Sequence, residues 1–366
     1  MRISRCRARV RHGTLALVAM LGCCLALSSG CNASDSNDEQ AGPSARAKAS
    51  GVCDRFASAR ARGGGNGTRT RPFRTFAQLV RSLGRGAVGC LAAGRYEHRG
   101  VVELQQPGIT IRPLGRARGR VVIDGAVWVM PRARGARIAR LSLVSHDPVF
   151  TIPLKIQADD VTVIANDITT STSISCVLIG SSRTVTGTVI ERNRITRCGR
   201  QGKHDHLIYV QKSRDAVIRN NLLTDNAGGW AVHLYPDADG TLIEHNVIDG
   251  NQGGVIFAGA RGETSDGNVV RENVITSSSP RYNIESSWSG GPFGSGNAAF
   301  DNCVFSSGLG APSGVADEEG FEESNNRLAT ADLYVNHDAG DFRLRPGTAC
   351  APVLRAAAGL PLLPRR

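Results

Sequence analysis

One short pattern recurs between Asp159 and Phe305 and limits what this chain can fold into. The pattern is an apolar residue, two further residues, Asn, one residue, and a second apolar residue. Successive asparagines lie 27, 28, 25, 27 and 29 residues apart, a period typical of solenoids. A repeat this short cannot form a domain alone, so each copy should form one coil of a stack. The asparagines are Asn166, Asn193, Asn221, Asn246, Asn273 and, in a weaker copy, Asn302.

A second apolar run lies between consecutive asparagines, for example HLIYVQ and WAVHLY. Polar, Gly-rich turns separate these runs, and few stretches have helical periodicity, so each coil should contain at least two strands. Asn tolerates a left-handed backbone, and its amide can bond its own turn and the equivalent amide one coil away. The spacing therefore predicts a ladder of stacked asparagines, and Asn268 falls outside it.

The repeats resemble the right-handed parallel β-helix (pectate-lyase-like) family of exported bacterial carbohydrate-active proteins. That family includes polysaccharide lyases, C5-epimerases and some glycosidases. The resemblance covers roughly residues 70–350 and implies an all-β, right-handed parallel β-helix; it is specific for the fold and not for a reaction. Before the repeats, Thr75 and Gln78 form a capping box ahead of an apolar stripe from Phe76 to Leu83, which predicts an N-terminal capping helix.

The first 30 residues are typical of a signal peptide, because five arginines precede an apolar run that ends in LSSGC. The small residues before Cys31 favour a lipoprotein whose Cys31 is lipidated, with ordinary secretion as the alternative. We expect residues 31–50 to be a flexible tether and residues 51–355 to be one β-helix domain. Within it we expect a cap over 51–100, coils over about 101–305 and a closing segment over 306–355, followed by a tail over 356–366.

Six cysteines remain after the signal peptide, and in an exported domain they favour disulfides over metal. The preferred pairs are Cys53 with Cys90 and Cys303 with Cys350, because the ends of a solenoid need closing. The connectivity stays open. No metal site is predicted, although calcium stays possible as a cofactor.

The precursor carries a net charge of +12, and removal of residues 1–30 takes away five arginines and no acidic residue, which leaves +7. A basic exported protein is suited to an anionic polysaccharide as its partner. We expect no nucleic acid, no membrane contact except a lipid anchor, and a monomer. Coding bias is the alternative explanation for the charge, since arginines number 40 and lysines four.

A functional site on a solenoid should appear as residues that break the repeat on one outward face. Alternation along the second strand places Trp230, Val232 and Leu234 inward. The outward column is then Lys155, Ile179, Tyr209, His233, Ile256 and Glu285.

Reaction at a uronate requires a cation for the carboxylate, a base for the C5 proton and an acid for the leaving oxygen. Stacked strands lie about 4.8 Å apart, so side chains of adjacent coils can act on one sugar. The predicted catalytic residues are His206, Tyr209, His233 and Lys212, and the predicted substrate-binding residues are Lys155, Lys203, Gln211, Tyr235 and Glu285.

Three functions remain open. A lyase or C5-epimerase acting on an anionic, uronate-containing glycan is preferred. A glycoside hydrolase using Asp237, Asp239 or Glu285 is weaker, because the two aspartates lie in a turn flanked by Pro and Gly, where Asp is common. A non-catalytic glycan-binding or structural β-helix protein at the cell surface is the third.

Overall fold

The computed structural model describes residues 52–115, 120–147, 149–170, 174–198, 205–286, 292–308, 314–316, 319–329, 333–350 and 353. All of them belong to one compact unit, Ala49–Arg366. The expected signal peptide, tether and tail lie outside these residues and stay predictions. None of the described helices is long and apolar enough to cross a membrane.

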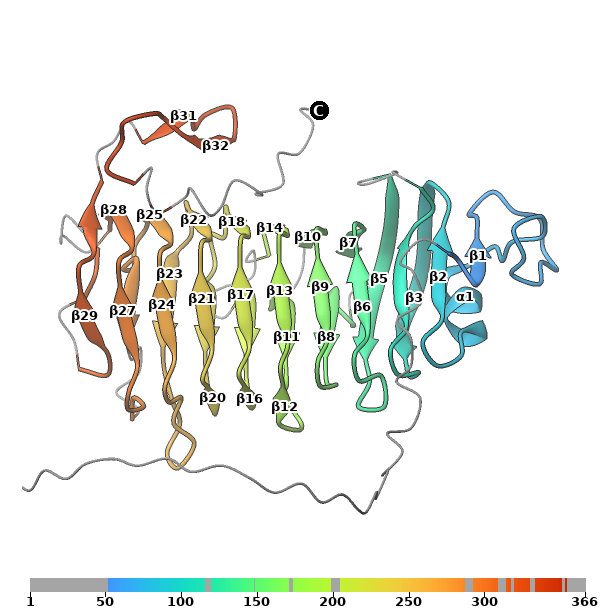
Figure 1. Cartoon of the computed structure of the whole chain (residues 1–366), viewed down its shortest axis with the longest axis horizontal. Coiled ribbons are helices and arrows are strands. Elements are labelled where there is room, and N and C mark those ends of the chain that lie inside the picture. The colour runs from blue at the N-terminus through green and yellow to red at the C-terminus, as the bar shows by residue number, and fades with distance from the viewer. Residues whose placement is uncertain are drawn as a thin grey trace, which may run out of the picture. The chain divides into compact units, whose positions relative to one another are not determined.

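The chain winds into stacked coils whose strands line up in parallel sheets (Figure 1). Face A is an eleven-stranded parallel sheet within the described residues. Its strands are β1 (Arg55–Ala57), β2 (Val88–Leu91), β4 (Thr110–Pro113), β6 (Arg137–Ala139), β9 (Thr162–Ile164), β13 (Val189–Glu191), β17 (Val217–Arg219), β21 (Leu242–Glu244), β24 (Val269–Arg271), β27 (Ala298–Phe300) and β29 (Glu322–Ser324).

Two further faces share a second sheet and meet at a long strand, β5 (Val121–Val129), which also pairs with β3 (Gly94–Leu104). Face B contains β7 (Ser142–Ser145), β10 (Asp167–Thr170), β14 (Arg194–Thr196), β18 (Leu222–Thr224), β22 (Val247–Asp249), β25 (Val274–Ser278), β28 (Cys303–Ser307) and β30 (Arg327–Leu328). Face C contains β8 (Leu154–Ile156), β11 (Ser175–Ile179), β15 (His206–Val210), β19 (Trp230–Leu234), β23 (Gly253–Phe257) and β26 (Ile284–Ser286), together with the C-terminal half of β5.

The remaining strands are short. Strands β12 (Val185–Thr186), β16 (Ser213–Arg214) and β20 (Ala238–Asp239) pair at the corner between faces C and A. Strands β31 (Tyr334–Asn336) and β32 (Asp341–Leu344) form an antiparallel hairpin near the C-terminal end. The other described strand pairings are parallel, which confirms the predicted parallel β-helix.

The asparagine ladder is confirmed and gains one further member, Asn326. The Asn193 side chain accepts hydrogen bonds from the backbone and amide nitrogens of Asn166, and Asn221 does the same for Asn193, at 2.9 to 3.1 Å. The same contacts continue through Asn302 to Asn326. The ladder asparagines from Asn166 to Asn302 are fully buried.

The expected left-handed backbone occurs one residue earlier than predicted. At this corner the residue directly before each ladder asparagine has positive φ, for example Arg192 at 54° and Glu272 at 52°. The ladder asparagines themselves do not. The amide is therefore selected by its side-chain hydrogen bonds, while the tight corner falls on a residue of variable type. Asn268, expected to be off the ladder, belongs to a second short ladder in which it bonds Thr241 and Asn297.

The core lies inside the coils and consists mainly of Val, Ile and Leu from all three faces. Helix α1 (Phe76–Ser82) carries the predicted capping box, and its Phe76, Leu79 and Val80 join this core. Its role as a cap stays a prediction. Trp230 does not face inward as expected, because the alternation shifts at Ala231, which takes the core position; Trp230 packs instead with Ile256 and Ala258.

Disulfides join Cys53 to Cys90 and Cys303 to Cys350, as preferred, and Cys176 to Cys198.

The C-terminal hairpin packs on face B through a polar cluster. His337 Nε2 lies 2.7 Å from Asp249 Oδ2, Thr276 Oγ1 donates to Asp249 Oδ1 at 2.6 Å, and the Tyr334 hydroxyl bonds Thr276 at 2.8 Å.

Candidate functional site

One column of non-repeating side chains crosses the coils on face C. Pairing of consecutive strands puts Trp128, Lys155, Leu178, Tyr209, His233, Ile256 and Glu285 in register. The column was predicted with Ile179 in place of Leu178. The prediction of Ile179 is wrong, because Val177 and Ile179 both face the core and Leu178 between them points to the other side of the strand.

Two histidines form the centre of this column. His233 Nδ1 and His206 Nε2 lie 2.9 Å apart, so one imidazole donates the shared hydrogen bond to the other. Their rings meet edge to face at 4.4 Å between centroids, and the ring of Trp230 lies 5.2 Å from that of His233.

Two tyrosines stack beside the histidine pair. The ring of Tyr209 lies 5.0 Å from that of His233 at 14°, and the ring of Tyr235 lies 5.4 Å from it at 22°. Burial raises the pKa of Tyr209 to about 12, opposed by a hydrogen bond from Gln211, so its hydroxyl stays protonated at neutral pH. Tyr209, Gln211 and Tyr235 are half-buried, which leaves part of each side chain open to a ligand.

The histidines themselves are much less accessible than the outward direction of the column predicts. His206 is 1% exposed and His233 is 2% exposed, because the surrounding aromatic rings pack over them. Tyr209 and Tyr235, both half-buried, are therefore the more accessible rings of this cluster.

Glu285 closes the column at its C-terminal end and is fully buried. It accepts a hydrogen bond from Trp230 Nε1 at 2.5 Å and forms an ion pair with Arg281. The Arg281 guanidinium also lies over the Trp230 ring, 5.7 Å from its centroid. These contacts hold the wall of the aromatic cluster, whereas the predicted contact of Glu285 with substrate stays a prediction.

Lys155 lies at the other end of the column. Its Nζ is 4.9 Å from the centroid of the Trp128 ring, and Phe150 meets the same ring edge to face at 6.0 Å. Burial lowers the pKa of Lys155. Leu178 separates Lys155 from Tyr209, so the two lie two coils, about 10 Å, apart. That separation is twice the one-coil spacing at which two side chains were expected to act on one sugar.

Of the other predicted lysines, Lys212, expected to be catalytic, lies outside the column. Its Nζ pairs with Glu263 at 3.0 Å, and its backbone occupies the left-handed region at φ 42°. Lys203 lies outside the described residues.

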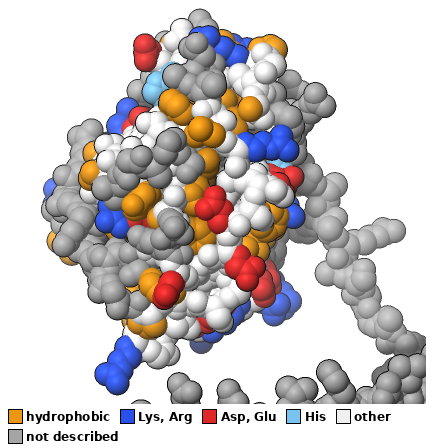
Figure 2. Space-filling view, turned by 90° about the vertical axis from the view of Figure 1, so that its left-hand side faces the viewer, with side chains coloured by type: hydrophobic (Ala, Val, Ile, Leu, Met, Phe, Trp, Pro, Cys, Tyr) orange, Lys and Arg blue, Asp and Glu red, His pale blue; other side chains and the backbone are white. Residues whose placement is uncertain are grey.

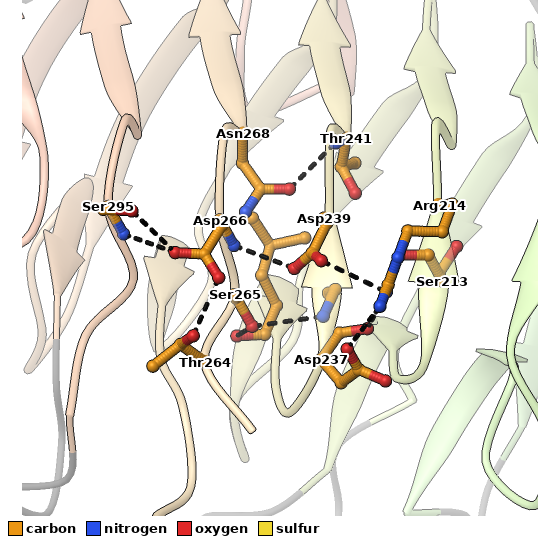
Figure 3. A network of polar contacts seen from close by, with 12 residues as sticks. Ser213, Arg214, Asp237, Asp239, Thr241, Thr264, Ser265, Asp266, Asn268 and Ser295 are labelled. Atoms are coloured by element: carbon orange, nitrogen blue, oxygen red, sulfur yellow. Dashed lines mark hydrogen bonds and ion pairs between the residues drawn. The ribbon is translucent and has the colours of Figure 1, made fainter. Parts of the chain in front are cut away.

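A second polar network occupies the corner between faces C and A, as Figure 3 shows. Arg214 pairs with Asp237 at 2.7 Å and with Asp239 at 3.3 Å. One coil on, Asp266 accepts hydrogen bonds from Thr264 and Ser295, while its backbone N donates to Asp239. Each carboxylate is thus tied to a neighbouring coil, and these contacts stabilise the corner.

Glu244, His245 and Glu272 are the one described group of three side chains whose donor atoms lie close enough to hold a metal ion. His245 Nε2 lies 3.1 Å from a Glu272 carboxylate oxygen, but Arg271 donates to Glu244 at 2.7 Å. The guanidinium already neutralises one of the carboxylates that a cation would need. This group lies at the corner between faces A and B, away from the column.

Comparison with known proteins agrees with the architecture. A family model described as a right handed beta helix region matches residues 152–275. This chain has the right-handed parallel β-helix fold. The crystal structure of pectate lyase Pel9A superposes on this β-helix protein with a TM-score of 0.60, at 12% identity, over 81% of this chain and 91% of the other.

An endo-xylogalacturonan hydrolase from Aspergillus tubingensis has the same fold, with a TM-score of 0.51, at 8% identity, over 75% of this β-helix protein and 92% of that chain. No curated protein sequence matches the chain. At these identities the likeness shows the fold alone.

Trp128 and Trp230 belong to this site but were not predicted as site residues. Trp128 stands 27 residues before Lys155, one repeat length, so extending the column into the coil before the first asparagine would have found it. Trp230 carried no such signal, because strict alternation assigns it to the core.

Proposed function

We propose that this β-helix protein is exported and acts on an anionic, uronate-containing glycan bound along the outer side of face C. The reaction that fits best is proton abstraction at C5, as in a polysaccharide lyase or a C5-epimerase. One observation carries the proposal: the half-buried Tyr209 is stacked on a hydrogen-bonded His206–His233 pair within a column that also holds Lys155.

The chemistry needs a group that moves a proton at the sugar. The Tyr209 hydroxyl is protonated at rest and can donate to a leaving oxygen or to C5. For abstraction the hydroxyl must first release its proton to solvent. A positive charge on the imidazole pair beside the ring would favour the resulting phenolate, which then accepts the C5 proton and is the hydroxyl again. In this scheme Tyr209 is the catalytic residue, while His206 and His233 control its charge.

Substrate binding is assigned to the half-buried side chains of the column and to those beside it. Lys155 would pair with the carboxylate of a sugar next to the reacting one, and the Trp128 ring offers an apolar surface beside it. Tyr235 and Gln211, both half-buried, flank the reacting sugar.

A non-catalytic glycan-binding protein of the cell surface is the second candidate, and the burial of His206 and His233 favours it. A glycoside hydrolase is the weakest, because Asp237 and Asp239 pair with Arg214, and Glu285 pairs with Arg281. Glycosidases need two carboxylates facing one sugar.

Export is supported by the three disulfides among the described residues, because disulfides form in oxidising compartments. We further propose that Cys31 is lipidated. Cys31→Ala should move the protein from the membrane fraction to the medium, and unchanged membrane association would contradict lipidation.

The deciding experiment is an assay of the purified protein on a panel of polyuronates. A lyase gives unsaturated products that absorb in the ultraviolet, an epimerase changes the sugar composition without cleavage, and a hydrolase gives reducing ends without unsaturation. Binding to a polyuronate without any of these changes would replace the enzyme with the binding protein.

A further inference from the structure

Charge is distributed unevenly along the chain. Residues 52–100 contain ten arginines and two acidic residues, whereas residues 301–350 contain three arginines and nine acidic residues. Because coils stack in the order of the sequence, this difference becomes a separation of charge along the solenoid. Coding bias towards arginine does not explain it, since it would act on the whole chain alike.

The ten arginines of residues 52–100 are all exposed. Among the described residues, Arg95 pairs with Glu97 and Asp124, and the other nine form no ion pair with an acidic side chain. These residues include β1 and α1, which lie at the N-terminal end of the stack (Figure 1). Figure 2 looks onto the opposite end, where acidic side chains are visible among hydrophobic ones, and Glu322 and Glu323 of β29 are exposed there.

We infer that the arginine-rich segment, residues 52–100, is a second binding surface for the same anionic polysaccharide, so that the protein prefers long chains to short oligosaccharides. This inference rests on the proposed function for the class of ligand and extends it to a surface outside the column. Exposed guanidinium groups attract a polyanion over about 10 Å at 0.1 M salt and release its condensed counterions on contact.

The strand spacing sets the minimum length of a glycan that could reach both surfaces. Glu103 of β3 pairs with Trp128, and four successive strand spacings separate Glu103 from Tyr209 in the column. At about 4.8 Å per spacing, this distance is about 19 Å. A glycan must therefore extend about 20 Å beyond the sugar at Tyr209 before it meets the arginine-rich segment, which a disaccharide cannot do.

The preference for an anionic polymer over an anionic membrane follows from the direction of this charge. Lys155 and the half-buried aromatic side chains lie on coils that follow the arginine-rich segment in the stack, so one long glycan can reach both. A bilayer would meet the end of the stack alone.

The test compares two double variants of the full exported protein. Arg69→Gln with Arg74→Gln removes two charges from the arginine-rich segment. Arg261→Gln with Arg327→Gln removes two exposed charges from the C-terminal part of the solenoid. Polygalacturonate, its trisaccharide and anionic phosphatidylglycerol vesicles serve as probes. Melting temperatures establish that both variants fold.

We expect the first variant to bind polygalacturonate about tenfold more weakly at low salt, with a shallower salt dependence, and to bind the trisaccharide as the parent does. The second variant should match the parent on both probes. Equal losses in both variants, an unchanged affinity in the first, or arginine-dependent binding to vesicles alone would overturn the inference. Tyr209→Phe separates the two proposals, because it should retain the arginine-dependent binding; if no uronate is turned over but that binding persists, only the proposed reaction fails.

Discussion

The asparagine ladder and the column on face C cross the same coils but follow opposite rules. In the ladder, the same residue occupies each coil from Asn166 to Asn326, and each amide bonds the next. In the column, seven successive positions hold seven different residue types. Both sets are constrained by strands about 4.8 Å apart.

The fold requires the same residue at each ladder position, whereas it accepts different residues along the column. A buried amide whose neighbours are identical amides gains full hydrogen bonding only when every coil agrees, so the position repeats. A position on the outer side of the coil has no such requirement. We therefore attribute the cluster of His, Tyr, Trp and Lys there to function and not to the fold. Substitutions in the column should therefore change activity, and substitutions in the ladder should change stability.

The largest effect should come from Tyr209→Phe. Removal of the hydroxyl leaves the ring stacked on His233 and removes the proposed proton carrier, so turnover of a polyuronate should fall by about 10²-fold or more with little change in melting temperature. Tyr96→Phe is the matched control, because its hydroxyl bonds the backbone oxygens of Ala57 and Ala92 far from the column. Full activity in Tyr209→Phe would remove the column from catalysis.

The ladder should respond in stability and not in activity. Asn221→Ala leaves the Asn193 amide and the Ile190 carbonyl without their buried partners, which should cost about 2 to 3 kcal/mol of unfolding free energy. Asn336, exposed in the hairpin, is the control and should cost less than about 1 kcal/mol. Asn268 is not suitable as a control, because it belongs to the second ladder. Equal losses at Asn221 and Asn336, measured by urea unfolding, would mean that repetition of the amide does not report its energetic role.

A smaller effect is expected at Lys155. Lys155→Ala should raise KM for a polyuronate about fivefold and leave kcat nearly unchanged, because the lysine is proposed to bind a neighbouring sugar and not the reacting one. The difference from the parent should shrink as salt rises and the charge attraction is screened. A fall in kcat with an unchanged KM would instead place the lysine at the reacting sugar.

The smallest effect tests whether every non-repeating polar contact is functional. The hydrogen bond to Asp249 raises the pKa of His337, so its stabilisation is present below the ordinary pKa of 6.5 and is lost as pH rises through the raised value. Half the side chain is exposed, so solvent screening limits the effect to a few tenths of a kcal/mol. The melting temperature should therefore fall slightly from about pH 6.5 upward. The same slope in His337→Gln would assign it to other groups.

The sequence was a sufficient guide wherever the fold repeats. The spacing of Asn166 to Asn302 predicted the coils, and the capping box at Thr75 predicted the helix, because each pattern has one local physical cause. The sequence did not predict the shift in alternation at Ala231 or the outward position of Leu178. Both depend on how the strand enters its coil, and strict alternation of inward and outward residues carries no information on that.

The sequence predicted which residues of the candidate site line up in one column, but not how deeply they are buried. Tyr209 and His233 were placed together correctly, since register follows from the repeat. The burial of His206 and His233 was not foreseen, because it arises from Trp230 and Tyr209 packing across coils. Tertiary packing of this kind leaves no signal in one strand's sequence.

The most direct test of the assignment of function to the column is a crystal structure of the Tyr209→Phe variant with a uronate hexasaccharide. The column predicts sugars running along face C from Trp128 to His233, with one carboxylate about 3 Å from Lys155 Nζ and the next sugars over the substituted ring beside Tyr235. A glycan bound instead at the Arg214–Asp237–Asp239 corner or on face B would contradict it.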